Sequence, residues 1–458
     1  MIQLENIIFL IVAGLGIGLF VWQIQKIRKN ILLGRDLDLT DNPSERINKT
    51  LLVAFGQQKM FKRMLPALLH LVVYIGFIVI NVEVIEILID GVFGTHRVLG
   101  FLGPVYSALM FINEILAALV IVACAMFLWR RNVTKVPRLA KGVEMRAWPK
   151  MDANTILVIE IVLMLALFTF NIAGLKLVEL QGGEAAGVYP ISQSLINLFG
   201  DNPQTLHLIE RVGWWLHIIG ILAFMNYLPS SKHFHIIMAF PNVYYSKLLP
   251  RGKFTTNPAI THEIKAMLDP SYQPPAPETD AEGNPVIQRF GAKDVEDLTW
   301  KQLMDAYTCT ECGRCTSVCP ANITGKLLSP RKIVMDTRDR MEEKGESPVI
   351  YDPARYGKDE GTERVKVTEE NTLLRGYITP EELWACTTCN ACTESCPVNI
   401  DQVSTIMDLR RYLVLEESAA PASLNAMFTN IENNGAPWAF PAADRFNWAE
   451  DIYVPSKN

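Results

Sequence analysis

The chain of 458 residues lacks the motifs by which many soluble enzymes bind nucleotides. It has no GxGxxG dinucleotide fingerprint, no Walker phosphate-binding loop and no other evident catalytic constellation. It also lacks a strong charge of either sign, because 43 Lys and Arg residues against 48 Asp and Glu residues give a net charge of -5. This charge is too mild to indicate a nucleic-acid partner. The sequence therefore offers no evident site for converting an organic substrate.

Cysteine is almost absent outside two short segments. Eight of the nine cysteines form two copies of the pattern C-x2-C-x2-C-x3-C-P, namely Cys309, Cys312, Cys315, Cys319 with Pro320, and Cys386, Cys389, Cys392, Cys396 with Pro397. This is the ligand spacing of paired 4Fe-4S clusters, in which the fourth cysteine of each motif binds the other cluster. We therefore expect one cluster on Cys309, Cys312, Cys315 and Cys396, and a second on Cys386, Cys389, Cys392 and Cys319.

Disulfides and structural zinc are the alternative interpretations of these cysteines. Disulfides need an oxidising compartment and have no reason to repeat a four-cysteine spacing. Structural zinc usually takes two CxxC pairs rather than a triple with a fourth cysteine beyond it. The ninth cysteine, Cys124, lies in an apolar run and is expected to pack as a small hydrophobic residue. The motifs thus predict an electron carrier with its clusters in a reducing, cytoplasmic compartment.

Long apolar runs are confined to the first 240 residues. Five of them are long enough to cross a bilayer, at about residues 6–24, 65–88, 105–129, 155–175 and 206–228. No basic region precedes the first run and no small-residue cleavage site follows it, so we interpret it as a span rather than a signal peptide.

Positive charge is scarce on one side of these predicted spans. Residues 23–63 carry nine Lys and Arg and residues 130–150 carry seven, whereas Arg97 and Lys176 are the only ones between spans two and three and between spans four and five. Because positively charged loops stay inside, the amino terminus is predicted outside and the chain after Leu228 in the cytoplasm. The expected location is the cytoplasmic membrane of a bacterium or archaeon.

The predicted fold is mainly α, with four parts. Residues 1–240 form a five-helix transmembrane haem b domain, residues 241–294 a proline-rich linker, residues 295–417 an expanded, helical, ferredoxin-like domain with two 4Fe-4S clusters, and residues 418–458 a tail. Helices are predicted from Ser329 to Arg340 and from Thr379, each with proline in its first turn. The aromatic residues of the tail either dock a partner or wrap over the cluster domain.

Three of the seven histidines lie in or next to the predicted spans. His70 falls in span two, His217 in span five and His235 just beyond span five. Polar residues inside a membrane are costly and usually functional, and two imidazoles from facing helices commonly hold b-type haem. Each histidine taken alone is also compatible with hydrogen-bonded packing, but beside two clusters a haem site is the better interpretation.

The segment from His217 through Pro229 and His235 resembles the fifth helix of the membrane gamma subunit of respiratory nitrate reductase, and the segment around His70 resembles its second helix. The resemblance implies a cytoplasm-side haem on His70 and His235. The outer haem would need His217 and the residue at position 80, which is Ile80 and cannot bind iron. Either the outer haem is missing or His217 has another partner, such as His96.

The pairing of His70 is not settled by the sequence. Counting about 1.5 Å per residue places His217 nearer than His235 to the depth of His70 if span five ends at Leu228. The motif favours His235, and the apolar run after it predicts that the helix continues past Pro229 with a kink.

The segments that begin at Cys309 and Cys386 resemble the small iron–sulfur subunit of heterodisulfide reductase and the cluster region of glycolate oxidase. The resemblance implies a membrane oxidoreductase that passes electrons between quinone and a cytosolic donor. Relatives of this layout also carry a domain with CCG motifs, which this sequence lacks. We therefore expect a separate cytosolic CCG-domain subunit or an electron-transfer flavoprotein as partner.

Two other functions remain open from the sequence. One is a heterodisulfide-reductase-like complex, and the other is a redox sensor without enzymatic activity. The presence of haem b favours the oxidoreductase over the sensor, because a sensor has little need of a transmembrane haem. Polar residues at membrane depth are candidates for proton transfer or quinone contact, namely Asn113, Glu114, Glu160, Glu210 and Arg211. The sequence assigns no quinone site among them.

Overall fold

The computed structural model describes residues 4–145, 148–250, 252–276, 283, 289–345 and 372–449. Within these ranges the chain is helical, and its only β-type pairings are two isolated bridges. This confirms the mainly α fold predicted from the sequence.

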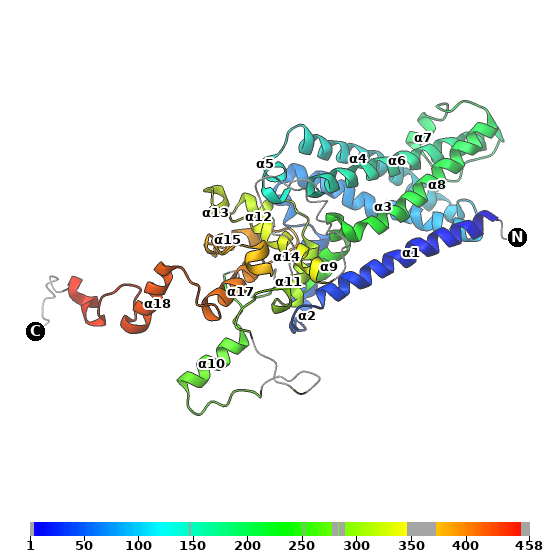
Figure 1. The fold of residues 1–458 in the computed structure, drawn as a ribbon. Coiled ribbons are helices and arrows are strands. Elements are labelled where there is room, and N and C mark those ends of the chain that lie inside the picture. Colours follow the sequence, from blue (N-terminus) through cyan, green and yellow to red (C-terminus); the bar gives the residue numbers. More distant parts are fainter. Residues whose placement is uncertain are drawn as a thin grey trace, which may run out of the picture. The chain divides into compact units, whose positions relative to one another are not determined.

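Five helices are long and apolar enough to cross a membrane (Figure 1). They are α1 (Leu4–Ile31), α3 (Met64–Phe93), α4 (Pro104–Asn132), α6 (Trp148–Leu180) and α8 (Pro203–Tyr227). Each corresponds to one predicted span, and the first four extend beyond the predicted limits at both ends. An apolar run predicts such a helix because, in lipid, every backbone N–H and C=O group must be hydrogen-bonded within its own segment, and a helix does this.

The membrane helices pack closely around one apolar core. Helix α6 contacts α8 and α4, α3 contacts α4, and α1 contacts both α3 and α8. Small residues permit the close approach of α6 and α8, since a Cβ atom at Gly220 would lie 2.6 Å from a methyl carbon of Leu163. The buried core includes Ile80, Cys124, Leu163, Phe170 and Ile218, so Cys124 packs as expected.

The fifth span does not continue as a kinked helix past Pro229, so that prediction was wrong. Helix α8 ends at Tyr227, and two 3₁₀ turns follow, η5 (Leu228–Ser230) and η6 (Lys232–Phe234). Ser231 between them is extended, with φ -126° and ψ 153°, which ends the helix. The chain then starts a separate helix, α9 (His235–Tyr244), with His235 at its first position.

The cysteine region is built from short helices with well-defined starts. They are α11 (Trp300–Thr308), α12 (Arg314–Ser317), α13 (Pro320–Ile323), α14 (Pro330–Lys344), α15 (Pro380–Trp384), α16 (Ala391–Ser395) and α17 (Gln402–Leu415). The predicted helix starts are confirmed: Ser329 caps α14, and Thr379 with Glu382 forms a capping box on α15. Helix α14 runs four residues past the predicted end at Arg340, and residues 346–371 lie outside the described part.

The remaining helices are all shorter than the five membrane helices. They are α2 (Pro43–Thr50), η1 (Leu51–Phe55), η2 (Met60–Lys62), η3 (Val98–Leu102), α5 (Pro137–Ala140), η4 (Val143–Met145), α7 (Pro190–Ser194), α10 (Pro258–Leu268), η7 (Val295–Asp297), η8 (Leu373–Tyr377), α18 (Ala422–Asn434) and η9 (Ala442–Ala449). Helix α10 falls inside the predicted linker, of which residues 251, 277–282 and 284–288 lie outside the described part. Helices α2 and η2, in the segment between α1 and α3, carry basic residues of a loop that was predicted to be cytoplasmic.

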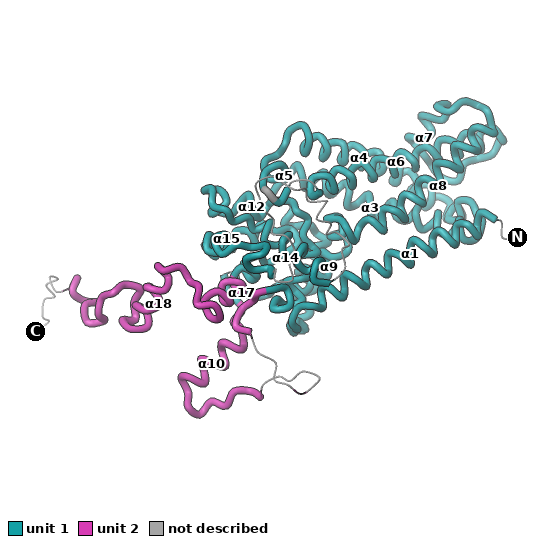
Figure 2. Tube along the Cα trace, in the orientation of Figure 1, with its two compact units in different colours: residues 1–254, 294–406 teal, residues 255–293, 407–458 magenta. Residues whose placement is uncertain are grey.

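The chain divides into two compact units (Figure 2). The first comprises residues 1–254 and 294–406 and contains both the membrane helices and the two cysteine motifs; the second comprises residues 255–293 and 407–458. Several aromatic side chains of the second unit are exposed, namely Trp438, Phe440, Phe446 and Trp448. The four-part division predicted from the sequence stays a prediction.

Candidate metal centres and histidine cluster

The two cysteine motifs share one backbone conformation. In the first, Glu311 and Gly313 have φ of 52° and 67°; in the second, the equivalent Thr388 and Asn390 have φ of 55° and 59°. Each second cysteine thus sits between two left-handed residues, a conformation that non-glycine residues adopt rarely. The left-handed pairs fold each three-cysteine run into a tight concave loop.

Each loop lines a cavity together with one cysteine from the other motif. The first cavity is lined by Cys309, Cys312, Cys315 and Cys396. The second is lined by Cys386, Cys389, Cys392 and Cys319. Four thiols line each cavity, and four thiolates are the donor set of a 4Fe-4S cluster. These are the same two sets that the spacing predicts.

Three of the four thiols around the first cavity are buried, namely Cys309, Cys315 and Cys396. Burial raises the pKa of Cys309 and of Cys396 to about 12, and it also raises the pKa of Cys315. Such thiols stay protonated unless a bound metal supplies positive charge. Backbone N–H groups point at sulfur in both motifs, from Ile400 to Cys396 and from Thr388 to Cys386, each at 3.4 Å. Hydrogen bonds of this kind tune the potential of a bound cluster.

The two cavities differ in their access to solvent. Cys309, Cys315 and Cys396 are buried around the first cavity, whereas Cys389 of the second cavity is exposed. The second cavity is therefore the one that lies closer to the surface of the unit.

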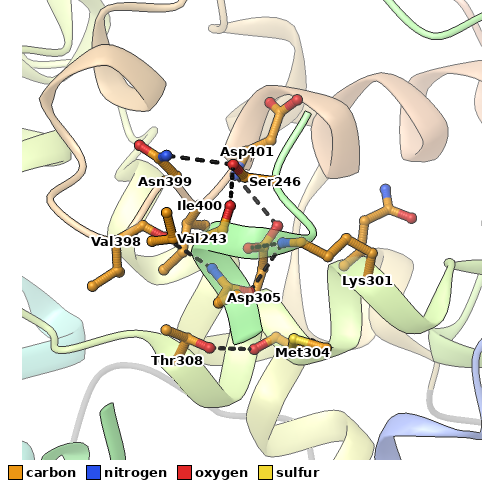
Figure 3. A network of polar contacts seen from close by, with 12 residues as sticks. Val243, Ser246, Lys301, Met304, Asp305, Thr308, Val398, Asn399, Ile400 and Asp401 are labelled. Carbon is orange, nitrogen blue, oxygen red and sulfur yellow. Dashed lines mark hydrogen bonds and ion pairs between the residues drawn. The ribbon is translucent and has the colours of Figure 1, made fainter. Parts of the chain in front are cut away.

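A polar network holds the segment that follows Cys396 (Figure 3). The side chain of Asn242, on α9, donates to the carbonyl of Val398 at 2.9 Å and accepts from Lys301 at 2.9 Å. Lys301 also pairs with Asp305 at 2.6 Å, and Asp305 accepts from the N–H of Asp401 at 3.4 Å. These bonds fix the cysteine that crosses between motifs relative to α9, which begins with His235.

The loops between membrane helices contact both cysteine motifs. Just before α3, Lys62 pairs with Glu394 of the second motif, and Arg63 donates to the hydroxyl of Ser317 in the first at 2.9 Å. From the loop after α4, Arg138 donates to the carbonyl of Cys312. From the sequence, these basic residues indicated only the membrane orientation. Nothing in the spacing of Lys62, Arg63 or Arg138 reveals their contacts.

A fully buried arginine connects the loop after α4 to the cysteine region. Arg331, at the start of α14, donates to the carboxylate of Glu144 at 2.8 Å and to the carbonyl of Arg138 at 2.7 Å. Both Arg331 and Glu144 are almost inaccessible to solvent. A buried guanidinium with paired acceptors specifies one arrangement of the two segments.

His70 on α3 and His235 on α9 face each other. Their ring centroids lie 6.3 Å apart. The Nδ1 atom of His235 is 3.0 Å from the carbonyl oxygen of Lys232, so Nδ1 carries the proton and Nε2 keeps its lone pair. A backbone carbonyl in this role is the usual support of a metal-binding histidine. The break after α8 is what turns His235 toward His70.

Sequence reasoning missed a third histidine at this position. The ring of His233 lies 5.4 Å from that of His235, and its Nε2 is 3.9 Å from a carboxylate oxygen of Glu160 on α6. The only available signal was its place two residues before His235. The result is a half-buried group of three imidazoles and one carboxyl, contributed by α3, α6 and the segment from η6 to the start of α9.

His217 lies apart from this group. Its ring centroid is 6.2 Å from that of Phe170, and its Nδ1 is 2.9 Å from the carbonyl oxygen of Leu163. Its buried Nε2 has no hydrogen-bond partner within the described residues. Ile80, which occupies the position of the missing histidine, is packed in the apolar core.

One residue links the histidines to the first cavity. The carbonyl of Lys232 accepts from His235, while its ammonium group pairs with Glu311, which lies between Cys309 and Cys312. Burial opposes ionisation of Glu311, but Lys232 and Arg338 outweigh it and lower the pKa of that carboxyl to about 2. The Glu311 carboxyl is therefore ionised at neutral pH.

Comparison with known proteins supports the iron–sulfur interpretation. Two family profiles, both described as 4Fe-4S dicluster domain, match residues 308–400 and residues 274–324. The cysteine region is thus a 4Fe-4S dicluster domain, as the cysteine spacing predicts. No solved structure matches the chain.

Three relatives define the wider similarity. The chain is 30% identical to the probable iron-sulfur-binding oxidoreductase FadF of Bacillus subtilis, over 98% of this chain and 62% of that protein. It is 25% identical to the EtfAB:quinone oxidoreductase of Syntrophomonas wolfei, over 93% of this chain and 57% of that protein. A probable membrane-anchored ferredoxin of Chromohalobacter salexigens is 39% identical over 36% of this chain and 25% of its own length.

The chain spans about six tenths of the length of the first two relatives. The similarity to both covers the membrane helices as well as the cysteine motifs, since it extends over more than nine tenths of this chain. The chain is therefore a homologue of iron–sulfur oxidoreductases, with a helical membrane part joined to a 4Fe-4S dicluster domain.

Proposed function

We propose that the chain is the electron-transfer subunit of a membrane quinone oxidoreductase. Electrons pass between a cytosolic partner, two 4Fe-4S clusters, haem b and membrane quinone. The observation that carries this proposal is the position of Lys232, which contacts both His235 and the Glu311 of the first cysteine motif. Because one residue contacts both a proposed haem ligand and a cysteine motif, the two cofactors are close enough for electron transfer.

The proposed ligands follow from the geometry of the two sites. One cluster takes Cys309, Cys312, Cys315 and Cys396, the other takes Cys386, Cys389, Cys392 and Cys319, and the haem takes His70 and His235. When bound, these groups supply one-electron chemistry, while the protein sets their spacing and their surroundings. We assign one haem to each chain, because Ile80 leaves His217 without the partner that the nitrate reductase pattern provides; a second haem on His217 is the alternative.

The order of the cofactors follows from their surroundings. The cluster with Cys389 lies nearest to solvent and exchanges electrons with the partner. The cluster with Cys309 is buried and adjoins Arg138 and Lys232 from the membrane-side segments, so it exchanges electrons with the haem. A cytoplasmic cluster domain and an amino terminus on the outside are supported by the basic loops that contact the motifs.

The partner that exchanges electrons with the clusters is a cytosolic protein, either a CCG-domain subunit or an electron-transfer flavoprotein. One relative is named EtfAB:quinone oxidoreductase, and both long relatives contain additional sequence that this chain does not cover. The exposed aromatic residues of the second unit supply a surface for such a protein.

Reoxidation by a quinone tests the proposed function. The anaerobic protein in lipid nanodiscs is reduced with dithionite, freed of excess reductant and mixed with menadione. Two electrons from the reduced centres and two protons from water convert one menadione to menadiol. We expect the haem and both clusters to be reoxidised, and His70→Ala to slow reoxidation of the clusters. Clusters that menadione reoxidises equally fast without the haem contradict the proposed order.

A further inference from the structure

A second polar cluster lies in the membrane domain, away from the three histidines. It is built around the pair Glu83 on α3 and Arg97 in the loop before η3, whose side chains are 2.8 Å apart. Arg97 also donates to the side-chain oxygen of Asn171 on α6, and Glu83 accepts from the amide of Asn113 on α4 at 3.4 Å. These side chains come from three different membrane helices and one loop, and all but Arg97 are buried to at least 98%.

Neighbouring carboxylates have structural partners and need no ligand. Glu114 accepts from the backbone N–H groups of Ile191 and Ser192, at 2.9 and 3.1 Å. Glu86 accepts from Tyr106 at 2.8 Å and from the N–H of Leu99 at 2.9 Å. These bonds anchor the segments between helices, which accounts for the charges of both residues.

The cluster around Glu83 differs because two of its polar atoms, and one atom of His217, whose ring adjoins the same Phe170 ring as Arg97, lack partners. They are Oδ1 of Asn113, Nδ2 of Asn171 and Nε2 of His217, and none has a hydrogen-bond partner within the part of the chain described. The three side chains are only 1%, 2% and 1% exposed. Burying a polar atom without a partner is unfavourable, so three of them in one region indicate a group that binds there.

The unpartnered atoms define the chemistry of this group. Asn113 donates its N–H to Glu83, so its oxygen is left as an acceptor. Asn171 accepts from Arg97 through its oxygen, so its N–H group is left as a donor. His217 must donate from Nδ1 to the carbonyl of Leu163, which leaves Nε2 as a second acceptor. The ligand therefore accepts one hydrogen bond and donates others.

Charge and shape restrict the ligand further. Arg97 disfavours a cation, and Glu83 disfavours an anion, so the ligand is neutral. The ring of Phe170 lies 6.2 Å from the His217 ring and 5.2 Å from the Arg97 guanidinium carbon, which places an aromatic wall beside the polar atoms. Carbonyl and hydroxyl oxygens on a flat, neutral, lipid-soluble ring fit this description.

We propose that this cluster binds the headgroup of a membrane quinone, in a site formed by Glu83, Arg97, Asn113, Asn171 and His217. The proposal rests on the proposed function and adds to it the place where quinone meets the chain. Asn171 donates to a quinone carbonyl, and Asn113 and His217 accept from the hydroxyl groups of the quinol. The site lies on the same helices that carry His70 and the segment leading to His235, separated from the haem ligands along α3 by more than three turns.

Photolabelling of the unaltered protein locates the site. The holoprotein in nanodiscs is irradiated with an azidoquinone, digested and sequenced by mass spectrometry. We expect labelled peptides from α4 or α6 near Asn113 and Asn171, and excess unlabelled menadione should remove the label. Competable label confined to the region of His233 and Glu160 overturns the proposal.

Two variants measure the contribution of the amides. We expect Asn113→Leu and Asn171→Leu each to weaken binding of 2-heptyl-4-hydroxyquinoline N-oxide, measured by fluorescence quenching, by about fivefold, as for one lost hydrogen bond. Thr169→Val is the matched control, because Thr169 is on α6 but half-buried and its hydroxyl donates to the carbonyl of Leu165 in its own helix. Unchanged affinity in both leucine variants overturns the site, and if neither variant assembles its clusters the photolabel decides.

The role of His217 has its own readout. We expect His217→Phe to keep the haem content per chain and to weaken binding of the analogue, whereas loss of haem shows that His217 is a haem ligand and removes it from the site. A protein that binds no quinone at all contradicts the proposed function. Quinone binding that is equal in all variants contradicts only this site.

Discussion

Lys232 pairs with Glu311 through its ammonium group while its own carbonyl accepts the hydrogen bond of His235. The two side chains of the pair are 9% and 3% exposed, and Arg338 binds the other oxygen of Glu311 at 2.8 Å. Because breaking a buried pair costs about 3–5 kcal/mol, we expect Lys232→Met to lower the thermal unfolding temperature and to shift the EPR signal of the cluster on Cys309. Lys326→Met, an exposed lysine, is the control and should change neither.

Removal of His70 tests the haem assignment. We expect His70→Ala to abolish the b-type absorbance of the dithionite-reduced protein while both iron–sulfur EPR signals persist, because only the haem loses a ligand. His207→Ala serves as the control, since His207 is an exposed histidine on α8. An unchanged haem content in His70→Ala discards the proposed pair.

Exchange of the fourth cysteine tests the crossing of ligands. We expect Cys396→Ser to disturb the cluster on Cys309, Cys312 and Cys315, and Cys319→Ser to disturb the other cluster, because each cavity receives its fourth thiol from the other motif. EPR of the two centres separates these outcomes, with Cys124→Ser as the control. The crossed arrangement is wrong if each serine affects the cluster of its own motif.

Gly313 offers a matched pair of glycine substitutions. It has φ of 67°, and a Cβ atom there would lie 2.5 Å from the carbonyl oxygen of Arg138, whereas Gly325 has φ of 85° and open space around it. Gly325→Ala carries only the cost of the left-handed backbone, about 1–2 kcal/mol. We expect Gly313→Ala to cost more and to lower the iron content of the purified protein. Equal iron content in the two variants would show that the contact with Arg138 is not needed.

The pH dependence of stability follows from Asp294. Burial raises the pKa of this carboxyl, but its hydrogen bonds and charge pairing with Arg340 outweigh burial and hold the pKa below 3.8. A lowered folded pKa means that ionised Asp294 stabilises the fold above about pH 4, and that this contribution is lost as the pH falls through the folded value. We therefore expect Asp294→Ala to lower the unfolding temperature at pH 7 and to have a smaller effect near pH 3. An effect that is the same at both pH values contradicts this assignment.

The five spans were predictable because an apolar run is a local feature of the sequence, and the two cysteine sets, also read from local spacing, stay a prediction that the cavity linings support. An apolar run must form a helix in lipid, and the cysteine spacing limits which thiols reach one cluster. The end of α8 was not predictable, since Pro229 is compatible with both a kink and a break. The break at Ser231 decides between His217 and His235 as the residue that faces His70.

The polar cluster around Glu83 was also beyond sequence reasoning. Arg97 stands alone in a predicted outer loop, and its return into the bundle toward Glu83 and Asn171 depends on tertiary packing. The sequence identified Asn113 as a polar residue at membrane depth but gave no partner for it. The contacts of Lys62 and Arg138 also depend on tertiary packing. In the sequence both residues were already explained by the charge rule for membrane orientation, which gives no partner for either.

The crossing of Cys319 and Cys396 between the two cavities has a consequence for biogenesis. The second cavity lacks its four thiols until the ribosome has passed Cys392, and the first until it has passed Cys396, because both need cysteines from the later motif. Iron insertion by the assembly machinery is therefore a late event, after all five spans have entered the bilayer. A nascent chain that stalls between the motifs would be anchored in lipid but unable to complete either cluster.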